Sequence, residues 1–211
     1  MITIIVEAIE ALPDVHKQRI KSGIEVLDIA CGCCSYWYDL HRTIKFKFID
    51  GIDETGTEIF FDKTAPEGQR SVKCGSYKHY LFECNNISKT EPTVRGEDFD
   101  SIFRRDSNSN DAFSYVDQLT EQGTKYDFVI LSNFLHLIDV PLQPKVEMLK
   151  KLPMIINNGG FVYLYGNNPM NEEEDIVRPR DRQIEVYLLP MKPVVQKYPG
   201  SNLYSLLLTK N

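Results

Sequence analysis

The apolar positions near the start of the chain recur with a helical period. One face is formed by Ile2, Ile5, Val6, Ile9 and Leu12. Glu7 and Glu10 fall on other faces, and this division predicts an amphipathic helix over residues 2–20 that packs on the domain. Pro13 has no backbone N–H, so it is expected to end or kink the helix.

Farther along, short apolar runs bounded by turn residues predict strands. These runs lie at residues 25–30, 45–53, 80–82, 126–133 and 161–165. Helical patterns separate them, for example at 112–119 and 144–152, and residues 157–160 form a predicted turn before the last run. Two more apolar runs, at 184–189 and 203–208, are close enough to pair antiparallel. The pattern predicts an α/β fold: a doubly wound, mostly parallel seven-stranded sheet with an antiparallel C-terminal hairpin.

Between residues 88 and 124 the alternating pattern gives way to polar and charged residues. A connection of this length is more often functional than inert, so an insert or lid is expected at 88–124. The chain has 211 residues, enough for one substantial core. A single domain over 1–211 is therefore predicted.

Composition places the chain among ordinary globular proteins, with 42% hydrophobic and 26% charged residues. The net charge of -6 and the pI near 5.3 argue against a partner with a phosphate backbone, so nucleic acid is not expected. No segment has the length of a membrane span, and the amino-terminus lacks the basic region of a signal peptide. We therefore expect a cytoplasmic protein without membrane contact.

Three of the 5 cysteines, Cys31, Cys33 and Cys34, lie close together. The C-x-C-C spacing is not that of metal ligands, and no histidine pair accompanies it, so no metal is expected. An odd number of cysteines fits reduced thiols better than a disulfide framework.

The run at 25–30 leads directly into a turn of small residues, Cys31-Gly32-Cys33-Cys34-Ser35, and then into a helical pattern. In open α/β sheets such a turn lies at the carboxyl end of a strand, where ligands bind. The amino-terminus of the following helix presents unpaired N–H groups to them. This stretch predicts a nucleotide-like cofactor site.

Four motifs carry a resemblance to a known family. They are Val-Leu-Asp-Ile-Ala-Cys-Gly-Cys-Cys at 26–34, Gly-Ile-Asp at 51–53, the strand motif at 126–136, and the helix, Gly-Gly turn and strand at 149–161. In order and spacing they resemble the class I S-adenosylmethionine-dependent methyltransferases of the small-molecule type. The resemblance implies a Rossmann-like methyltransferase fold and S-adenosylmethionine as cofactor. It also implies methyl transfer to an oxygen, nitrogen or sulfur nucleophile of a small molecule.

The resemblance further implies roles for residues in the first motif. Asp28 would engage the ammonium group of the cofactor's methionine part, directly or through water. Ala30, Cys31 and Gly32 would form the turn that lets the backbone approach the same part of the cofactor.

Residues after the second and third predicted strands take roles by the same resemblance. Asp53 would accept hydrogen bonds from both ribose hydroxyls, and Glu54 would line the same rim. Asn85 or Asn86 falls where family members often place an acid that contacts the adenine amino group, and an asparagine carbonyl can accept the same bond.

The end of the fourth-strand motif would lie beneath the reactive methyl group. The resemblance places Ser132, Asn133 and Phe134 there as the floor of the site. His136 is the candidate general base, because an imidazole titrates in the right range. The alternative for His136 is a structural role, packed under the sheet.

The first motif departs from the family at its glycines. Only Gly32 remains of three, since Ala30 and Cys34 stand at the other two places. If either place requires a positive φ, a Cβ there costs about 1 kcal/mol. This departure leaves open an inactive cofactor-binding or interaction module. A nicotinamide-dependent oxidoreductase is a third interpretation, because residues 30–35 faintly echo G-x-G-x-x-G, although Asp28 and the predicted hairpin fit methyl transfer better.

Overall fold

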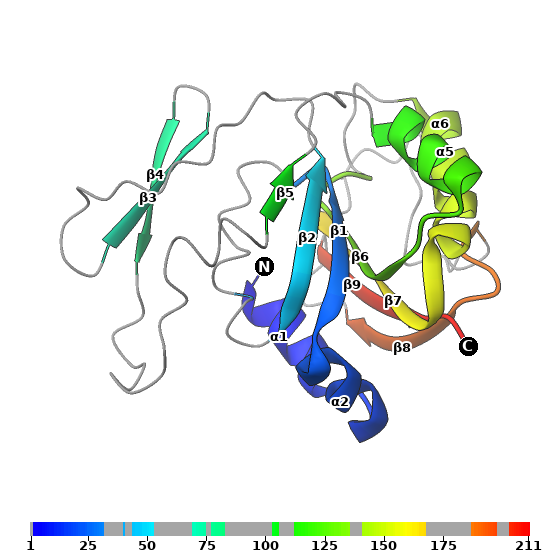
Figure 1. Cartoon of the computed structure of the whole chain (residues 1–211), viewed down its shortest axis with the longest axis horizontal. Helices are drawn as coiled ribbons and strands as arrows, with labels where there is room; N and C mark the ends of the chain where they lie inside the picture. The colour runs from blue at the N-terminus through cyan, green and yellow to red at the C-terminus, as the bar shows by residue number, and fades with distance from the viewer. Residues whose placement is uncertain are drawn as a thin grey trace.

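The main sheet has seven strands in the order β5-β2-β1-β6-β7-β9-β8, as the computed structural model of the chain shows (Figure 1). The model describes residues 2–31, 40, 44–52, 69–74, 77–82, 103–105, 112–135, 141–167, 187–197 and 203–211. The strands of this sheet are β1 Ile24–Ile29, β2 Phe46–Ile52, β5 Phe103–Arg105, β6 Tyr126–Ser132, β7 Ile156–Asn167, β8 Lys192–Lys197 and β9 Leu203–Thr209.

Strand direction in this sheet is mostly parallel. Strands β5, β2, β1, β6 and β7 pair in parallel, and β9 runs antiparallel to both of its neighbours, β7 and β8. Strand β8 follows β7 in the chain but reaches the sheet only through β9. The predicted parallel α/β sheet with an antiparallel C-terminal hairpin is therefore confirmed.

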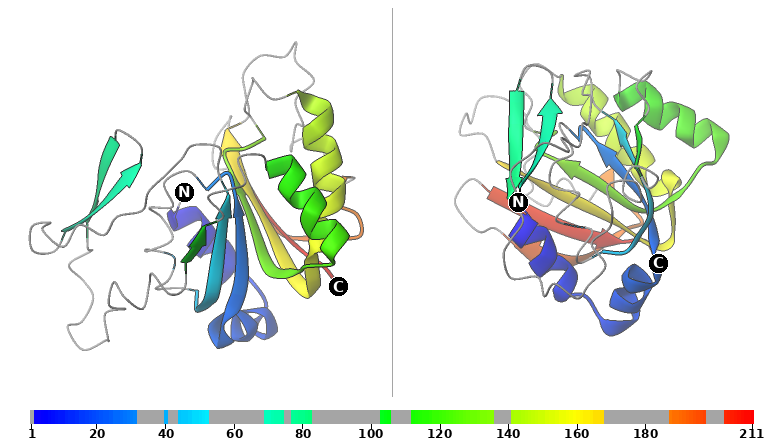
Figure 2. Two further views of the ribbon diagram at one scale, coloured as in Figure 1. Left: turned by 45° about the horizontal axis from the view of Figure 1, so that its top comes forward. Right: turned by 60° about the vertical axis from the view of Figure 1, so that its left-hand side comes forward.

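Helices cover both faces of the sheet, as Figure 2 shows. Helices α1 (Ile2–Glu10) and α2 (Asp14–Ser22) lie on one side, and α5 (Ala112–Gln122) and α6 (Leu142–Lys151) lie on the other. The short 3-10 helix η1, Leu152–Ile155, follows α6. The predicted break at Pro13 is confirmed, because this residue separates α1 from α2. Within the described residues, no helix is both long and apolar enough to cross a membrane.

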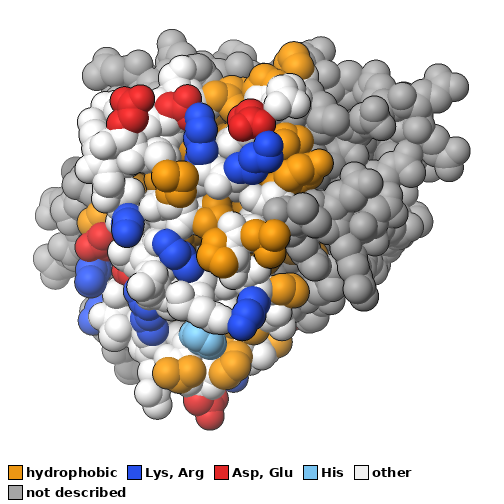
Figure 3. Space-filling model, turned by 90° about the vertical axis from the view of Figure 1, so that its right-hand side faces the viewer, with side chains coloured by type: hydrophobic (Ala, Val, Ile, Leu, Met, Phe, Trp, Pro, Cys, Tyr) orange, Lys and Arg blue, Asp and Glu red, His pale blue; other side chains and the backbone are white. Residues whose placement is uncertain are grey.

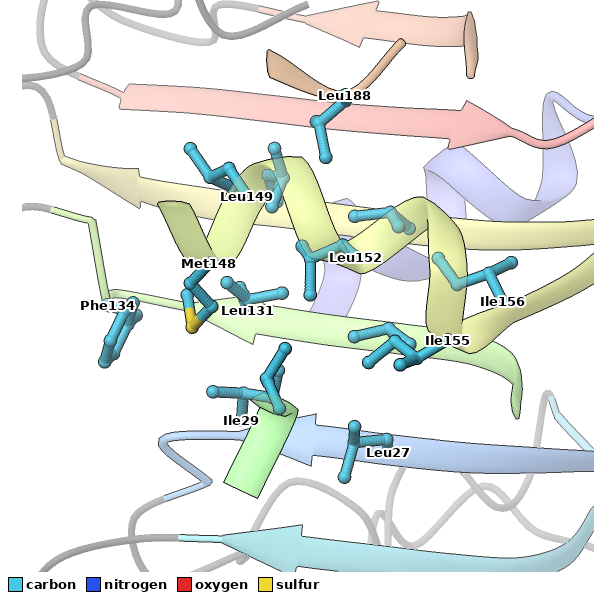
Figure 4. Close-up of a cluster of buried hydrophobic side chains, with 14 of the residues drawn as sticks. Leu27, Ile29, Leu131, Phe134, Met148, Leu149, Leu152, Ile155, Ile156 and Leu188 are labelled. Atoms are coloured by element: carbon cyan, nitrogen blue, oxygen red, sulfur yellow. The ribbon is translucent and has the colours of Figure 1, made fainter. Parts of the chain in front are cut away.

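The central strands separate two apolar cores. In β1, Val26 belongs to the core under α1, whereas Leu27 and Ile29 belong to the core under α5 and α6. All seven residues of β6 are buried, which is why this strand reads as a continuous apolar run rather than an alternating one. Figure 4 shows the second core, where side chains of α6 and η1 lie over β1 and β6.

The third strand of the main sheet is not the predicted run at 80–82. Those residues belong to β4 (Tyr77–Phe82), which pairs antiparallel with β3 (Gln69–Cys74) in a separate two-stranded sheet. The neighbour of β2 is β5, only three residues long. A strand this short carries too little pattern to compete with the longer aromatic run.

The predicted insert at 88–124 contains elements of the main fold. Strand β5 pairs with β2, and α5 packs on the sheet through Val116 and Leu119. The helix expected at 112–119 is thus present and three residues longer, ending at Gln122. Residues 88–102 and 106–111 of this segment lie outside the described residues.

The first strand of the C-terminal hairpin is β8, not the run at 184–189. Residues 188–190 form a turn in which Leu188 is buried and Leu189 is exposed. Strand β8 contains Pro193, which cannot donate to a ladder and so weakened the strand pattern. It is tolerated because β8 is an edge strand with a register shift between Pro193 and Val195.

The predicted turn at 157–160 lies within β7. Tyr126 pairs with Ile156 and Phe128 with Phe161, so the intervening residues of β7 bulge out of register. Gly159 has φ +71, and Arg19 Nη1 would lie 2.6 Å from a Cβ built there. The Gly-Gly pair therefore makes an irregularity inside a strand.

Asp127 ties this bulge to α2 at the amino ends of the strands. Its carboxylate accepts hydrogen bonds from Arg19 Nη2 at 2.6 Å, Asn157 Nδ2 at 3.1 Å and the backbone N–H of Glu25 at 3.1 Å. Burial alone would raise the pKa of Asp127, but these three donors together hold it below its ordinary value of 3.8. We call Asp127 with its three donors, Arg19, Asn157 and Glu25, the Asp127 clasp. It lies at the edge of the sheet opposite to the predicted site.

The surface over α6 and β8 is mixed in character. Figure 3 shows Lys and Arg side chains dispersed among apolar and uncharged groups on this face, with acidic side chains mainly toward its edges. This face is thus more basic than the net charge of -6 indicates for the whole chain.

Candidate functional site

The sheet order places a topological switch point between β1 and β6. From β1 the chain builds the sheet outward through β2 and β5, and it then returns to β6 on the other side of β1. In open α/β sheets, ligands bind outside the carboxyl ends of the strands at this point. Figure 4 shows the arrowheads of β1 and β6 pointing to the same end, where Phe134 lies.

Asp28 lies near the carboxyl end of β1 and has no exposed surface. It pairs in register with Gly51 of β2 and Ile130 of β6. Acids are rarely buried completely in an apolar strand, and they are retained there where hydrogen bonding or binding compensates them. The structure therefore places the first predicted site residue at the strand end where the prediction required it.

Two non-glycine residues in the described chain have left-handed backbone, and both follow strands at the switch point. Ala30, after β1, has φ +58, and Asn133, after β6, has φ +56. Asparagine enters this region readily, but the Cβ of alanine costs about 1 kcal/mol there. Strain of this kind is concentrated at functional sites. Ala30 thus adopts the conformation for which the family's glycine is suited.

Backbone hydrogen bonds fix these strand ends to their neighbours. Cys31 is buried, and its N–H donates to the carbonyl oxygen of Ile52 at 3.0 Å. The N–H of Asn133 donates to the carbonyl oxygen of Tyr165 at 2.7 Å. Four neighbouring strand ends, those of β2, β1, β6 and β7, are consequently held in a fixed arrangement.

The last residue of β6 and the three residues after it are mostly buried. Ser132, Phe134 and Leu135 are buried, whereas Asn133 is exposed. The ring of Phe134 lies 5.6 Å from the ring of Phe113 of α5, and Figure 4 shows it beside Met148 of α6. The aromatic side chain of this segment is therefore packed against α5 and lies beside α6.

Lys145 of α6 supports the same turn. It is 3% exposed, and its Nζ donates to the carbonyl oxygen of Leu135 at 3.0 Å. The sequence analysis missed this residue. Helical periodicity could have indicated its burial. Lys145 falls three and four positions before the buried Met148 and Leu149, and hence on the apolar face of the helix.

Among the predicted site residues, the structure brings together Asp28, Ala30, Cys31, Ser132, Asn133 and Phe134 at adjacent strand ends. The others, Gly32, Asp53, Glu54, Asn85, Asn86 and His136, lie outside the described residues. The reason for choosing Asn85 and Asn86 no longer holds, because the strand before them is not in the main sheet. The residue that follows β5 in the sequence is Asp106.

Comparison with known proteins identifies the fold. No protein-family model matches the sequence, and no curated protein matches it. Among solved structures, an O-methyltransferase family protein from Burkholderia thailandensis matches 98% of this chain and 55% of its own, with 11% identity and a TM-score of 0.53. The PH0226 protein from Pyrococcus horikoshii OT3 matches 97% of this chain and 90% of its own, with 14% identity and a TM-score of 0.51.

The chain spans about half the length of the first of these proteins. At such identities the likeness is one of fold. The chain has the fold of the class I S-adenosylmethionine-dependent methyltransferases.

Proposed function

We propose that this chain binds S-adenosylmethionine at the carboxyl ends of β1, β2 and β6 and transfers its methyl group to a small molecule. The acceptor atom is an oxygen, nitrogen or sulfur nucleophile. The observation that carries the proposal is the fully buried carboxylate of Asp28, two residues before the left-handed Ala30, at the switch point of a methyltransferase fold.

In this proposal the first motif binds the methionine part of the cofactor. Asp28 attracts the ammonium group, because a carboxylate in a poorly solvated position interacts strongly with a cation. The turn of Ala30, Cys31 and Gly32 brings backbone groups close to the cofactor's carboxylate end. The small side chains of this turn leave room for that approach.

The second motif and the end of β5 bind the nucleoside part. Asp53, which follows Ile52 in the sequence, would accept hydrogen bonds from the ribose hydroxyls, and Glu54 would line the same rim. Asp106 takes the adenine-binding place first given to Asn85 or Asn86, because it follows the strand that pairs with β2. An acid accepts a hydrogen bond from the adenine amino group at least as well as an amide does.

Bound S-adenosylmethionine supplies an electrophilic methyl group on a sulfonium. The chain's own contribution is alignment and exclusion of water. Ser132, Asn133 and Phe134 would form the floor, which the contacts described above hold in place. His136, the next residue but one after Phe134, removes the proton from the acceptor where the acceptor carries one.

Calorimetric titration with S-adenosylhomocysteine tests the binding part of the proposal. The wild-type chain is expected to bind it, and D28N and D53N are expected to bind it at least about tenfold more weakly. D14N is the matched control, because the Asp14 side chain is 92% exposed and lies on α2. The melting temperature of each variant separates loss of binding from loss of folding.

The alternatives predict other outcomes. Binding without transfer of a labelled methyl group to any nucleophile offered would support an inactive binding module. Binding of a nicotinamide dinucleotide in preference to S-adenosylhomocysteine would support an oxidoreductase. Absence of binding by the wild-type chain would rule out both the enzyme and the inactive cofactor-binding module.

A further inference from the structure

Tyr204 of β9 lies at the same edge of the sheet as the candidate site. It pairs directly with Gly166 of β7. The preceding residue of β7, Tyr165, pairs with Ser132 and accepts the hydrogen bond from Asn133. Tyr204 is therefore only one residue pair beyond the strand end that carries the proposed floor.

The ring of Tyr204 lies over the backbone of Gly166. A Cβ built on Gly166 would come within 2.8 Å of Tyr204 Oη and 3.1 Å of its Cζ. Any larger residue at 166 would displace the phenol. The absence of a side chain at Gly166 thus lets the hydroxyl lie over β7.

The hydroxyl of Tyr204 is buried and has no hydrogen-bond partner among the described residues. The residue is 3% exposed. A buried hydroxyl without a partner costs about 1–3 kcal/mol, whereas a phenylalanine would fill nearly the same space without that cost. Packing alone gives no reason for the oxygen atom.

A nearby tyrosine shows the usual solution. The hydroxyl of Tyr163, on the other face of β7, lies 3.1 Å from Ser205 Oγ. Both tyrosines are buried, on opposite faces of the sheet, but among the described residues only the Tyr163 hydroxyl has a hydrogen-bond partner. The Tyr204 hydroxyl is therefore a polar group left for a ligand to satisfy.

The surroundings restrict the chemistry of that ligand. Tyr204 belongs to the same cluster of buried hydrophobic side chains as Phe134 and Leu135. Burial raises the pKa of Tyr204, so its hydroxyl is a neutral donor and acceptor and not a base. A charged ligand group beside the Tyr204 hydroxyl would lose its hydration and gain only one hydrogen bond to a neutral partner.

We propose that the Tyr204 hydroxyl binds the methyl acceptor, and that the acceptor is a largely apolar molecule that presents an uncharged polar group, such as a hydroxyl, carbonyl or amide, to it. This inference rests on the proposed function for the identity of the ligand as methyl acceptor. The geometry of Tyr204 and Gly166 stands independently of it.

The first test is the stability of Y204F against Y163F. Y204F removes an unsatisfied hydroxyl, so its melting temperature is expected to be equal to or about 2–4 °C above that of the wild type. Y163F breaks a hydrogen bond and is expected to melt below the wild type. A lower melting temperature for Y204F would show that a protein group satisfies the hydroxyl, and it would overturn the proposal.

The second test is a titration with four probes of similar size: benzyl alcohol, benzamide, benzoate and benzylamine. In the presence of S-adenosylhomocysteine, the wild type is expected to bind the two uncharged probes more tightly than the charged ones. Y204F is expected to bind the uncharged probes roughly three- to tenfold more weakly. Its affinity for S-adenosylhomocysteine and that of Y163F for the probes should equal the wild-type values.

The same titration without S-adenosylhomocysteine separates the two proposals. If the wild type fails to bind S-adenosylhomocysteine but binds benzyl alcohol in a way that Y204F weakens, the proposed function fails and the ligand site at Tyr204 stands. Equal probe affinities of Y204F and wild type would overturn the site. Preference for benzoate or benzylamine, or no saturable binding of an uncharged probe, would overturn it as well.

Discussion

Ala30 and Asn133 occupy equivalent positions after two neighbouring strands, β1 and β6, and both have left-handed backbone. Ala30 carries local strain in this conformation, whereas asparagine enters it readily. The hydrogen bonds from Cys31 to Ile52 and from Asn133 to Tyr165 hold these turns in place. The turns are therefore shaped by the sheet and not by their own sequence.

Replacing Ala30 with glycine tests this strain. A30G removes about 1 kcal/mol of backbone strain from the folded state. It also gives the unfolded chain more conformational entropy, which lowers the stability by about 0.4–1 kcal/mol. The free energy of unfolding, measured by urea denaturation, should consequently change by less than about 0.5 kcal/mol. A8G is the control, because Ala8 is buried in the middle of α1 and glycine there should cost about 1 kcal/mol or more. An equal loss in both variants would contradict the strain at Ala30.

The clasp at Asp127 predicts a dependence of stability on pH. The folded-state pKa of Asp127 lies below its ordinary value of 3.8, so the folded protein favours the charged carboxylate. Its stabilising contribution is complete above about pH 5 and is lost as the pH falls through 3.8 toward the lower folded-state pKa. D127N should lose roughly 1–3 kcal/mol of unfolding free energy at pH 7, and the difference from wild type should shrink at pH 3.

D14N is the matched control for this measurement, because its carboxylate is almost fully exposed. Urea denaturation at pH 7 and pH 3 gives the four values needed for each pair of proteins. A deficit of D127N that stays the same at both pH values would show that its carboxylate charge is not what stabilises the clasp.

The contact between Gly166 and Tyr204 predicts coupling between two substitutions. G166A places a Cβ against the phenol and should cost about 1–3 kcal/mol of unfolding free energy. In the Y204F background the atom of closest approach is absent, so the cost of G166A should fall by roughly 0.5–1 kcal/mol. Urea denaturation of the four proteins in the cycle measures this coupling, and strictly additive effects would contradict the close approach.

Lys145 predicts a difference between two truncations. K145M keeps an apolar stem and removes the donor to Leu135, so it should lose about 0.5–1.5 kcal/mol. K145A also removes the buried stem and should lose a further 1–2 kcal/mol or so. K150A is the control, since the Lys150 side chain is half exposed and its pair with Glu147 contributes at most about 0.5 kcal/mol. Equal losses for K145M and K150A in denaturation would contradict a role for the buried hydrogen bond.

The fold was predictable where apolar runs are long and both faces of a strand are buried. Strand β6 is the example, because every residue in it is buried. Strand β5 was not predictable, since its three residues include two arginines and its pairing depends on β2. Strand β8 was missed because Pro193 interrupts its pattern and only its place at the edge of the sheet permits it.

The candidate site was predictable to the extent that it follows strand ends. Asp28 and Ala30 lie where the first strand and its turn were expected, and Ser132 to Phe134 follow the fourth. Lys145 and Tyr204 were missed because their roles depend on partners distant in the sequence. The periodicity of α6 indicates that Lys145 is buried but not that it donates to Leu135, and no pattern near Tyr204 indicates its contact with Gly166.

Strand β8 precedes β9 in the chain but is joined to the sheet only through it. During synthesis β8 emerges first, and it has no place in the sheet until β9 has docked against β7. Until β9 is in place, the unpaired strand can form hydrogen bonds with other chains. The proline and the two lysines within β8 make it a poor template for such pairing. The residues that weaken its strand pattern in the sequence therefore also protect the nascent chain.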